Sequence, residues 1–402
     1  MEAAMRILVC NIGSTSLKYK LFEMSGEDIL CHGGIDGVGR ASSRISHSTG
    51  GELVVDEMRP IADQFTAIGQ MVELLVKGKH PVLDSFDALG AIAFKVVGAA
   101  GITGAVVLND GVLDAMEAHT PLLPRHNPPY ITAIRYFRKL TPDVPLIGLF
   151  ETSFHATIPE KAYTYGVPHD WVEQLGVRRL GYHGASFTYI AERVVQILGK
   201  PAGAFCVIAC HLGGSSSICA IKNGRSVDTS MGMSTQAGVS MSSRCGDIDP
   251  FALLYVMDRL GLSTDEVREI LTSEGGLAGI SGLSGDMREL ERAASKGHEG
   301  AQKALDIFAY EVKKYIGAYA ASMGGLDAVV FTGGIGENGC AMRARICDGL
   351  EFLGVEIDAK RNQIRGVEAI ISPDEGHVSV LVVPTNEEII VARSAAKILE
   401  RR

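Results

Sequence analysis

The stretch FETSFHATIP, residues 150–159, sets an acid, two alcohols and an imidazole directly after an apolar run. The preceding residues VPLIGLF have the composition of a buried strand that ends at Phe150. Glu151 and His155 are residue types that serve as acids, bases and metal ligands. Their place at the end of a buried strand raises the question of which reaction they serve.

Three turns have the composition of anion-binding loops. NIGSTSLK, residues 11–18, combines Gly13 with hydroxyl side chains and Lys18. HLGGSSS, residues 211–217, also combines glycine with hydroxyl side chains but has no lysine. FTGGIGEN, residues 331–338, follows the apolar run LDAVVFT. A glycine-rich turn leaves backbone N–H groups free to face an anion or a nucleotide. None of the three matches the P-loop pattern G-x-x-x-x-G-K-[ST], and each alone is also explained by the steric need for glycine in tight turns.

Single charged residues stand in segments of small residues. Arg244, in SSRCGDIDP, could stabilise charge on a transferring phosphoryl group, or it could form a surface ion pair. His183, between two glycines in RLGYHGASF, faces a ligand or belongs to a plain loop. Glu387 follows the candidate helix caps Thr385 and Asn386. A carboxylate there interacts with the helix dipole or binds Mg2+ directly or through water.

Short runs rich in Val, Ile and Leu and bounded by Gly, Asn or Asp predict strands. They lie at 6–10, 16–22, 89–97, 145–150, 204–210, 215–221, 327–332 and 379–383. Apolar residues at helical spacing predict helices near 63–77, 110–118, 129–139, 185–198, 250–260, 264–272, 286–295, 299–322, 341–350 and 386–400. Long helices that alternate with buried strands predict an α/β fold. Asp286 stands at the start of one predicted helix and is expected to cap it.

One pattern occurs twice. RILVCNIGSTSLKYKLFE begins at Arg6, and FCVIACHLGGSSSICAIKNG begins at Phe205. Each is an apolar strand, a polar residue, a glycine, a serine-rich turn and a second strand. The repeat predicts two halves of similar fold that present hairpin turns to a shared cleft, although two such hairpins can also be alike by chance. We expect one domain at 1–150 plus 385–402 and a second at 151–384.

The overall composition excludes several classes of protein. The chain has 402 residues, of which 46% are hydrophobic and 21% charged, as in soluble globular proteins. Its net charge of -9 argues against a general nucleic-acid binder. No apolar run reaches the roughly 18 residues that span a bilayer. The scattered cysteines include no C-x2-C pair, so we expect reduced thiols in a cytoplasmic protein. From the net charge and the lack of a long apolar run, we expect no membrane or nucleic-acid partner.

Taken together, the motifs resemble the acetate kinase family, in the family's order from Arg6 to about Lys397. The segments that carry the resemblance are NIGSTSLK, RHNPP, FETSFHATIP, GYHGAS, HLGGSSS, VDTSMGMS, SRCGDIDP, FTGGIGEN and PTNEE. The family belongs to the superfamily of actin, hexokinase and the Hsp70 ATPase domain. The resemblance implies two duplicated ribonuclease H-like domains around a nucleotide cleft, usually in a homodimer. It also implies the reaction ATP + carboxylate ⇌ ADP + acyl phosphate with Mg2+ or Mn2+, and acetate as the default acid.

The resemblance also implies roles for individual residues. Asn11 and Glu387 match the metal-site positions, and Glu151, His183 and Arg244 match the catalytic ones. The implied substrate-binding residues are Lys95, Val97, Arg125, Tyr182 and Thr235. The implied nucleotide contacts are Lys18, His211, Leu212, Gly213, Gly214, Ser215, Asp286, Met287, Arg288, Gly333, Gly334, Ile335, Gly336 and Glu337.

The implied reaction joins two anions, because a carboxylate attacks a γ-phosphoryl group. Catalysis is then mainly positioning and charge neutralisation by Mg2+, Arg244, His183 and a cation that grips the carboxylate. Glu151 could orient Mg2+-bound water or a neighbouring basic side chain. It need not accept a proton, because a carboxylate nucleophile at pH 7 has none to lose.

The chain departs from the family's usual residues at several site positions. The family's H-R-V-V-H-G-G is FKVVGAA here, so its substrate-gripping arginine is Lys95, which keeps the charge and loses the bidentate fork. The usual aspartate is Glu151, which is longer by a methylene. Phe187 stands at a second histidine position, and Gly214-Ser215 replaces the usual Asn-Gly of the nucleotide loop.

Most positions of the usual pocket wall have become more polar. Val97 is kept, whereas the others are Arg125, Tyr182 and Thr235. One hypothesis is a larger or more polar acid, such as a hydroxy acid or a dicarboxylate, whose second polar group pairs with Arg125. The alternative is that Arg125 turns outward and Lys95 only weakens acetate binding.

Two further functions stay open at this point. A paralogue that binds nucleotide with little catalysis would explain the changed residues, although a decaying site need not keep its remaining charged residues together. A hydroxyl kinase of the same superfamily would need a base near the acceptor alcohol, and Glu151 is the obvious candidate.

Overall fold

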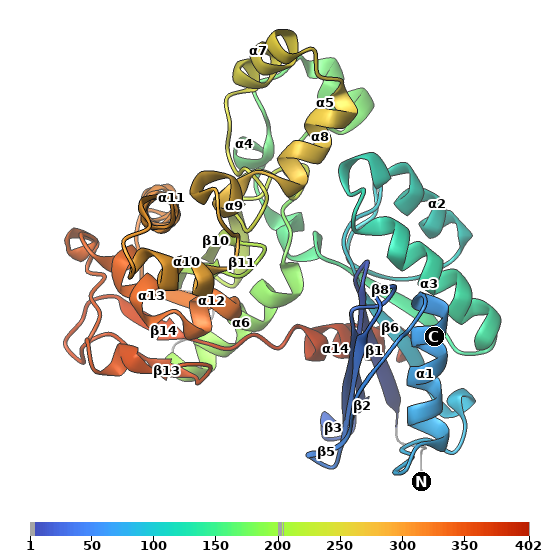
Figure 1. Ribbon diagram of the computed structural model, residues 1–402. Helices are drawn as coiled ribbons and strands as arrows, with labels where there is room; N and C mark the ends of the chain where they lie inside the picture. The colour runs from blue at the N-terminus through green and yellow to red at the C-terminus, as the bar shows by residue number, and fades with distance from the viewer. Residues whose placement is uncertain (1–4, 200–202, 204, 402) are drawn as a thin grey trace. The chain divides into compact units, whose positions relative to one another are not determined.

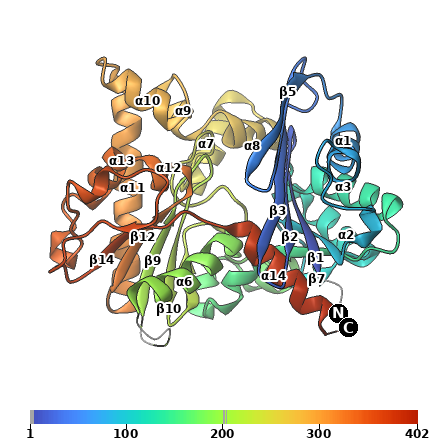
Figure 2. The same cartoon turned by 90° about the horizontal axis from the view of Figure 1, so that it is seen from below.

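The computed structural model describes residues 5–199, 203 and 205–401. These residues form two compact units. The N-terminal unit runs to Ser153 and resumes at Asn386, and the C-terminal unit spans Phe154–Thr385. Each unit contains one β-sheet with helices packed on it, so the predicted α/β class is confirmed (Figure 1, Figure 2). In the described part of the chain, no helix has the length and apolar character needed to cross a membrane.

The N-terminal unit is built on an eight-stranded sheet in the order β5-β4-β3-β2-β1-β6-β8-β7. Its strands are β1 (Arg6–Ile12), β2 (Ser16–Glu23), β3 (Asp28–Asp36), β4 (Ser43–Thr49), β5 (Glu52–Arg59), β6 (Ala91–Val96), β7 (Ala105–Val107) and β8 (Leu146–Phe150). Its helices are α1 (Gln64–Lys77), α2 (Asp110–Ala118), α3 (Asn127–Leu140) and α14 (Glu387–Leu399). Because β1, β6 and β8 are mutually parallel, their carboxyl ends lie at the same edge of the sheet.

Strand β1 is buried on both faces, which explains its unbroken apolar run. Leu8, Cys10 and Ile12 belong to the core cluster that includes α1, α2 and α3. Ile7 and Val9 point to the opposite face, since side chains alternate along a strand, and they are also buried. Helix α14 packs against β1, β6 and β8. The last helix of the chain is therefore an integral part of this unit, on the side of the sheet away from α1 to α3 (Figure 2).

The C-terminal unit is built on a six-stranded sheet in the order β11-β10-β9-β12-β14-β13. Its strands are β9 (Cys206–His211), β10 (Ser217–Lys222), β11 (Arg225–Thr229), β12 (Ala328–Thr332), β13 (Ala369–Ile370) and β14 (Ser379–Val382). Its helices are α4 (Glu160–Tyr163), α5 (His169–Leu175), α6 (Gly184–Leu198), α7 (Pro250–Leu260), α8 (Thr264–Ser273), α9 (Gly276–Ser281), α10 (Met287–Ala294), α11 (Glu299–Met323), α12 (Gly333–Asn338) and α13 (Cys340–Cys347). Helix α11 packs on the face of Ile208, and α6 packs on the opposite face with Val207.

The two sheets share an order of five strands. In the N-terminal unit this order is β3-β2-β1-β6-β8, and in the C-terminal unit it is β11-β10-β9-β12-β14. Each begins with antiparallel neighbours and continues with strands parallel to the central one. The repeated hairpins β1–β2 and β9–β10 are the two sequence segments that looked alike. The predicted internal duplication is confirmed at the level of topology.

Several elements were not predicted from the sequence. Strands β3, β4 and β5 were missed because their buried positions carry little apolar signal. In β4 the buried residues include Ser43 and His47, and β5 has no buried residue. Helices α4, α5 and α9 were also missed.

Two local expectations were wrong. FTGGIGEN was expected as a turn that follows a strand, but α12 begins at Gly333 directly after β12. Thr385 was a candidate cap of the last helix, but the Asn386 side chain alone caps α14, by accepting the Ile389 N–H.

Candidate active site

Three predicted site residues lie at the carboxyl ends of adjacent parallel strands in the N-terminal unit. Asn11 is near the end of β1, Lys95 is near the end of β6, and Glu151 directly follows β8. The Glu151 N–H donates to the Val96 carbonyl at 2.9 Å, which extends the β6–β8 ladder by one bond. In open α/β sheets, ligands bind at such strand ends.

Lys95 and Glu387 form an ion pair between Nζ and Oε2. Glu387 is the first residue of α14, and the side chains of Lys95 and Glu387 are only 19% and 13% exposed. Burial opposes the charge on Lys95, but the carboxylates of Glu387 and Glu151 outweigh it and raise the pKa of Lys95 above its ordinary value. Lys95 is therefore an ammonium ion that is paired with Glu387 and further stabilised by the charge of Glu151.

Asn11 is oriented by a residue that the sequence motifs did not single out. The Tyr130 hydroxyl, from α3, donates to Asn11 Oδ1 at 2.8 Å. Burial raises the pKa of the Tyr130 phenol, so it stays protonated and remains a donor. Tyr130 directly follows the RHNPP segment, so its place beside a family motif was the signal that could have found it. Asn127, in the same segment, donates to the carbonyls of Gly98 and Met116 and fixes the start of α3.

The remaining predicted residues of this unit differ in environment. Lys18 lies opposite Asn11 in the β1–β2 ladder and is exposed. Val97 is half-buried and packs against the core of the unit. Arg125 is exposed, so this unit by itself does not enclose it in a pocket.

The oxygen donors at this strand edge fit a hard divalent cation. Asn11 offers an amide oxygen, and Glu387 offers a carboxylate that the Lys95 ammonium contacts. The described residues contain no group of three or more His, Cys, Asp or Glu side chains that could hold a metal ion. Mg2+ is commonly held by one or two protein oxygens together with water and substrate phosphates. Asn11 and Glu387 match that sparse arrangement, in which the nucleotide would complete the coordination.

Two predicted histidines stack in the C-terminal unit. The rings of His183 and His211 lie 4.2 Å apart, centroid to centroid, at an interplanar angle of 21°. His183 Nδ1 is 2.8 Å from Ser217 Oγ, and His211 Nδ1 is 2.9 Å from Ser186 Oγ. His183 also has a φ of 60°, which is rare for a residue with a side chain. The start of α6 therefore holds this imidazole in one orientation.

A cavity of about 530 Å³ opens among the predicted nucleotide loops of the C-terminal unit. Its size is within the range of small-molecule sites. It is lined by the predicted Gly213, Gly214, Asp286, Met287, Arg288, Gly334 and Ile335, and by Ser242, Gly285, Glu291, Asn338, Gly339 and Arg365. Arg365 is a cation that the motifs did not indicate. Asp286 also caps α10 by accepting the Arg288 N–H at 2.9 Å, as expected from the sequence.

The turn into α12 explains why glycine stands at its first position. Gly333 has a φ of 75°, and a Cβ there would lie 2.7 Å from the Leu212 carbonyl oxygen. Glu337 Oε1 accepts the N–H groups of Gly333 and Thr385 at 2.9 and 3.2 Å. Gly336 is buried against Phe331. Gly333, Gly336 and Glu337 thus shape the turn, and the cavity itself is lined by their neighbours.

Arg244 is held within a well-anchored loop. Its Nη1 donates to the Thr235 carbonyl at 2.8 Å, while Thr235 itself is buried. Burial lowers the pKa of Arg244 to about 10, so the guanidinium stays charged at neutral pH. Nearby, the Ser240 N–H and hydroxyl both donate to Glu311, at 2.7 and 3.1 Å. These bonds restrict the loop that presents Arg244.

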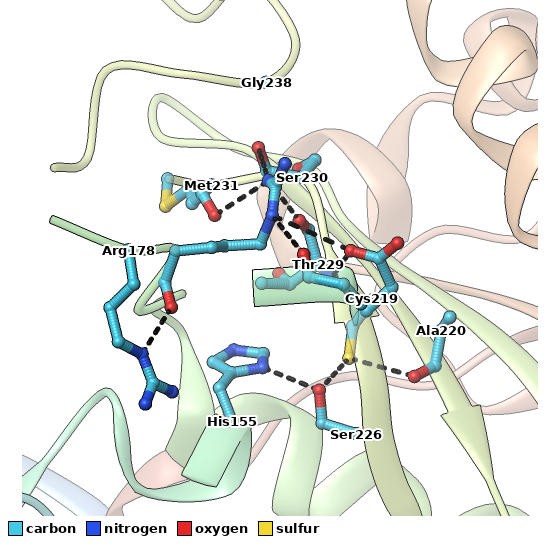
Figure 3. A network of polar contacts seen from close by, with 12 residues as sticks. His155, Arg178, Cys219, Ala220, Ser226, Thr229, Ser230, Met231 and Gly238 are labelled. Atoms are coloured by element: carbon cyan, nitrogen blue, oxygen red, sulfur yellow. Dashed lines mark hydrogen bonds and ion pairs between the residues drawn. The ribbon is translucent and has the colours of Figure 1, made fainter. Parts of the chain in front are cut away.

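The stretch FETSFHATIP divides between the two units. Glu151 belongs to the N-terminal unit, and His155 belongs to the C-terminal unit. His155 is buried, and its Nε2–H donates to the Tyr182 carbonyl at 2.8 Å. Its Nδ1 lies 2.8 Å from Ser226 Oγ (Figure 3). The Tyr182 hydroxyl donates to the Met233 carbonyl at 2.6 Å. His155 therefore positions the segment of Tyr182 and His183.

A second network anchors the strand end that leads to Thr235. Arg179 Nη1 donates to the carbonyl oxygens of Thr229, Ser230 and Met231, at 2.7, 3.2 and 3.3 Å. Figure 3 labels these three acceptor residues. One cation thus holds three successive carbonyls in place. The backbone between β11 and Thr235 is fixed by contacts that no short motif reveals.

These features define a class of protein. Two α/β units with the same order of five strands and a glycine-lined cavity are the properties of proteins built from duplicated actin-like ATPase domains. The chain belongs to the acetokinase family, whose model matches residues 6–393. It is therefore a phosphotransferase with a carboxyl group as acceptor, and the resemblance inferred from the motifs is confirmed.

Named relatives match the chain over nearly its whole length. The acetate kinase of Carboxydothermus hydrogenoformans is 43% identical over 396 residues, which are 98% of this chain and 99% of the relative. The crystal structure of Porphyromonas gingivalis acetate kinase matches with a TM-score of 0.88 and 38% identity, covering 98% and 100% of the two chains. A propionate kinase from Francisella tularensis matches with a TM-score of 0.88 and 32% identity, covering 97% and 98%.

His155 makes the stability of the C-terminal unit depend on pH. Burial lowers the pKa of His155 from 6.5 to about 4. Between these values the unfolded chain takes up a proton that the folded chain does not, so stability falls as pH drops from 6.5 towards 4. We expect His155→Gln to remove about 2 kcal/mol of the loss between pH 7 and pH 5. Urea unfolding followed by Trp171 fluorescence at both pH values measures it.

The exposed His377 supplies a matched control in the same unit. His377→Gln should keep the full acid sensitivity of the unmodified protein. Equal pH dependence in His155→Gln and His377→Gln would show that His155 is not the group responsible.

Proposed function

We propose that the protein transfers the γ-phosphoryl group of Mg-ATP to acetate or a related short carboxylic acid, giving ADP and an acyl phosphate. The observation that carries this proposal is the cluster of Asn11, Lys95 and Glu151 at three adjacent strand ends, with Glu387 against Lys95. An ammonium ion beside oxygen ligands suits a reaction between a carboxylate and a metal-bound phosphate. The named relatives, which are acetate and propionate kinases, support the same acid class.

The chemistry is an in-line displacement. A carboxylate oxygen of the acid forms a bond to the γ-phosphorus, the bond from that phosphorus to the β–γ bridging oxygen breaks, and ADP leaves with the electron pair. No proton has to move. Asn11 and Glu387 would hold Mg2+, which would neutralise phosphate charge. Arg244 and His183 stabilise the charge that spreads over the transferring oxygens.

The remaining roles follow from position. The cavity lined by Gly213, Arg288 and Gly334 takes the nucleotide. Lys95 grips the acid carboxylate, and Glu151 orients Lys95 through its charge. The exposure of Arg125 favours acetate or propionate over an acid that needs a second buried cation. A more polar acid is the alternative, and a panel of acids distinguishes the two.

Turnover by the purified protein tests the proposal. ADP release is measured with Mg-ATP and acetate, propionate, lactate, glycolate, malonate or succinate, and hydroxylamine traps any acyl phosphate. We expect turnover with acetate or propionate. Arg244→Ala should lower kcat by about 1,000-fold, because an arginine on a transferring phosphoryl group contributes on that order. The dissociation constant of ADP should stay within a few-fold of the original.

Arg135→Ala removes a partly exposed arginine paired with Glu117 and serves as the control, with activity expected to be unchanged. More than a tenth of the original kcat in Arg244→Ala would refute its role in the transfer. Turnover of polar acids alone would make Arg125 and Thr235 specificity residues. Nucleotide binding without turnover of any acid would favour the weakly catalytic paralogue.

We further propose a homodimer formed through helices α5, α7 and α8 of the C-terminal unit. These helices contain no buried residue, although α7 reads PFALLYVMDRL. Phe251, Tyr255 and Leu260 are 76%, 61% and 69% exposed. Isolated helices of this length are marginal in water, and apolar patches of this kind mark interfaces. A second copy that offers the same face would bury them in a two-fold contact.

The dimer is tested by light scattering coupled to size exclusion. The unmodified protein should elute with twice the mass of one chain, and the double variant Phe251→Glu with Leu254→Glu should elute as a monomer. Phe352→Glu, which changes a phenylalanine that is 80% exposed elsewhere in the unit, is the control and should remain dimeric. A monomeric unmodified protein, or a dimeric double variant, contradicts this surface.

We also propose a cytoplasmic location. All eight cysteines are free thiols, which is the state expected in a reducing compartment.

A further inference from the structure

Two groups proposed to bind different ligands bind each other in the structure. Lys95 is the proposed partner of the acid carboxylate, and Glu387 is a proposed ligand of Mg2+. Their ion pair is largely shielded from water, with side-chain exposures of 19% and 13%. Glu151 also lies close enough to Lys95 for its carboxylate to raise the pKa of the ammonium. The acid-binding cation and the metal-binding anion are thus each other's counter-ion.

The energetic reason for the pair is burial. An isolated charge in a buried site costs several kcal/mol, so each group needs an opposite charge whenever its ligand is absent. Because each group needs only an opposite charge, a ligand of that charge can replace its partner. A divalent cation on Glu387 supplies more charge than an ammonium ion, and it repels the ammonium at short range. Lys95 then requires a new anion, which the carboxylate of the acid can provide.

Lysine suits such an exchange better than arginine. Its ammonium is a compact point charge on a flexible four-carbon stem, whereas a guanidinium binds a carboxylate through a rigid two-pronged contact. Residue 95 is a lysine, so this chain carries the more easily exchanged cation.

We propose that Lys95 is an internal counter-ion that the metal displaces from Glu387, so that metal binding frees the acid-binding cation and the metal and the acid promote each other's binding. This inference rests on the proposed function of the site. In the absence of both ligands, Lys95 and Glu387 stay bound to each other. Binding of either ligand releases the residue that the other one needs.

Metal binding without nucleotide tests the exchange directly. Mn2+ is titrated into the protein and free Mn2+ is followed by electron paramagnetic resonance. Lys95→Met should raise the Mn2+ affinity about tenfold, within the roughly 5- to 150-fold range typical of coupled sites. Lys20→Met is the matched control, because it removes the same charge from the neighbouring Lys20–Glu388 pair, whose atoms lie 3.1 Å apart. It should change the affinity by less than about threefold.

Acetate supplies the second arm. In the unmodified protein acetate should tighten Mn2+ binding about fivefold or more, because it takes Lys95 away from Glu387. The effect should vanish in Lys95→Met and persist in Lys20→Met. If Lys95→Met does not fold, the change in Mn2+ affinity that acetate causes in the unmodified protein decides whether the exchange occurs.

Three outcomes overturn the exchange: Lys95→Met binds Mn2+ no more tightly than Lys20→Met, acetate leaves Mn2+ affinity unchanged, or acetate still acts in Lys95→Met. None of these measurements uses ATP or turnover. Loss of the coupling with intact acetate phosphorylation therefore refutes the exchange alone. Intact coupling without phosphorylation of any acid refutes the proposed function instead.

Discussion

The need to neutralise charge at one edge of a buried sheet governs the N-terminal unit. Strands β1, β6 and β8 are parallel, so Asn11, Lys95 and Glu151 meet where the strands end. An ammonium ion there needs carboxylates, and α14 returns from the far end of the chain to supply one through Glu387. The helix therefore does two things at once: it covers one face of the sheet, and it delivers the counter-ion of the site.

The duplicated sheets use the same strand ends for different purposes. In the N-terminal unit the central strand ends near Asn11 and its parallel neighbour ends near Lys95. In the C-terminal unit the matching strands end at His211 and Thr332, and α12 begins at Gly333. Charged side chains suit a small acid and a metal ion, whereas glycines that expose backbone N–H groups suit a nucleotide. On the proposed function, the same topology would accommodate the two partners of the phosphoryl transfer.

The sequence was informative where the signal was local. The segments beginning at Arg6 and Phe205 predicted the duplication because each combines a buried strand with a glycine-serine turn. Both segments form hairpins at matching positions of the two sheets. Strand β5 could not be predicted in this way, since none of its residues is buried. The glycines of α12 favour a turn over a helix in the sequence, and the close approach of Gly333 to Leu212 and of Gly336 to Phe331 becomes apparent only in the fold.

The site was only partly predictable for the same reason. Family motifs brought Asn11, Lys95 and Glu387 to attention one by one, but no pattern links residues 292 positions apart, as Lys95 and Glu387 are. Tyr130, which is 119 positions from Asn11, was missed on the same ground. Such partners depend on how the strands and α14 come together, which is a property of the whole unit.

The exchange of partners at Glu387 is tested most directly by a crystal structure of the protein with Mn2+ and acetate. Anomalous scattering would locate the metal without relying on its surroundings. The account predicts Mn2+ bound to a carboxylate oxygen of Glu387, with Lys95 moved away from that carboxylate and paired with acetate. Mn2+ bound elsewhere, or bound to Glu387 while the Lys95–Glu387 ion pair stays intact, would contradict it.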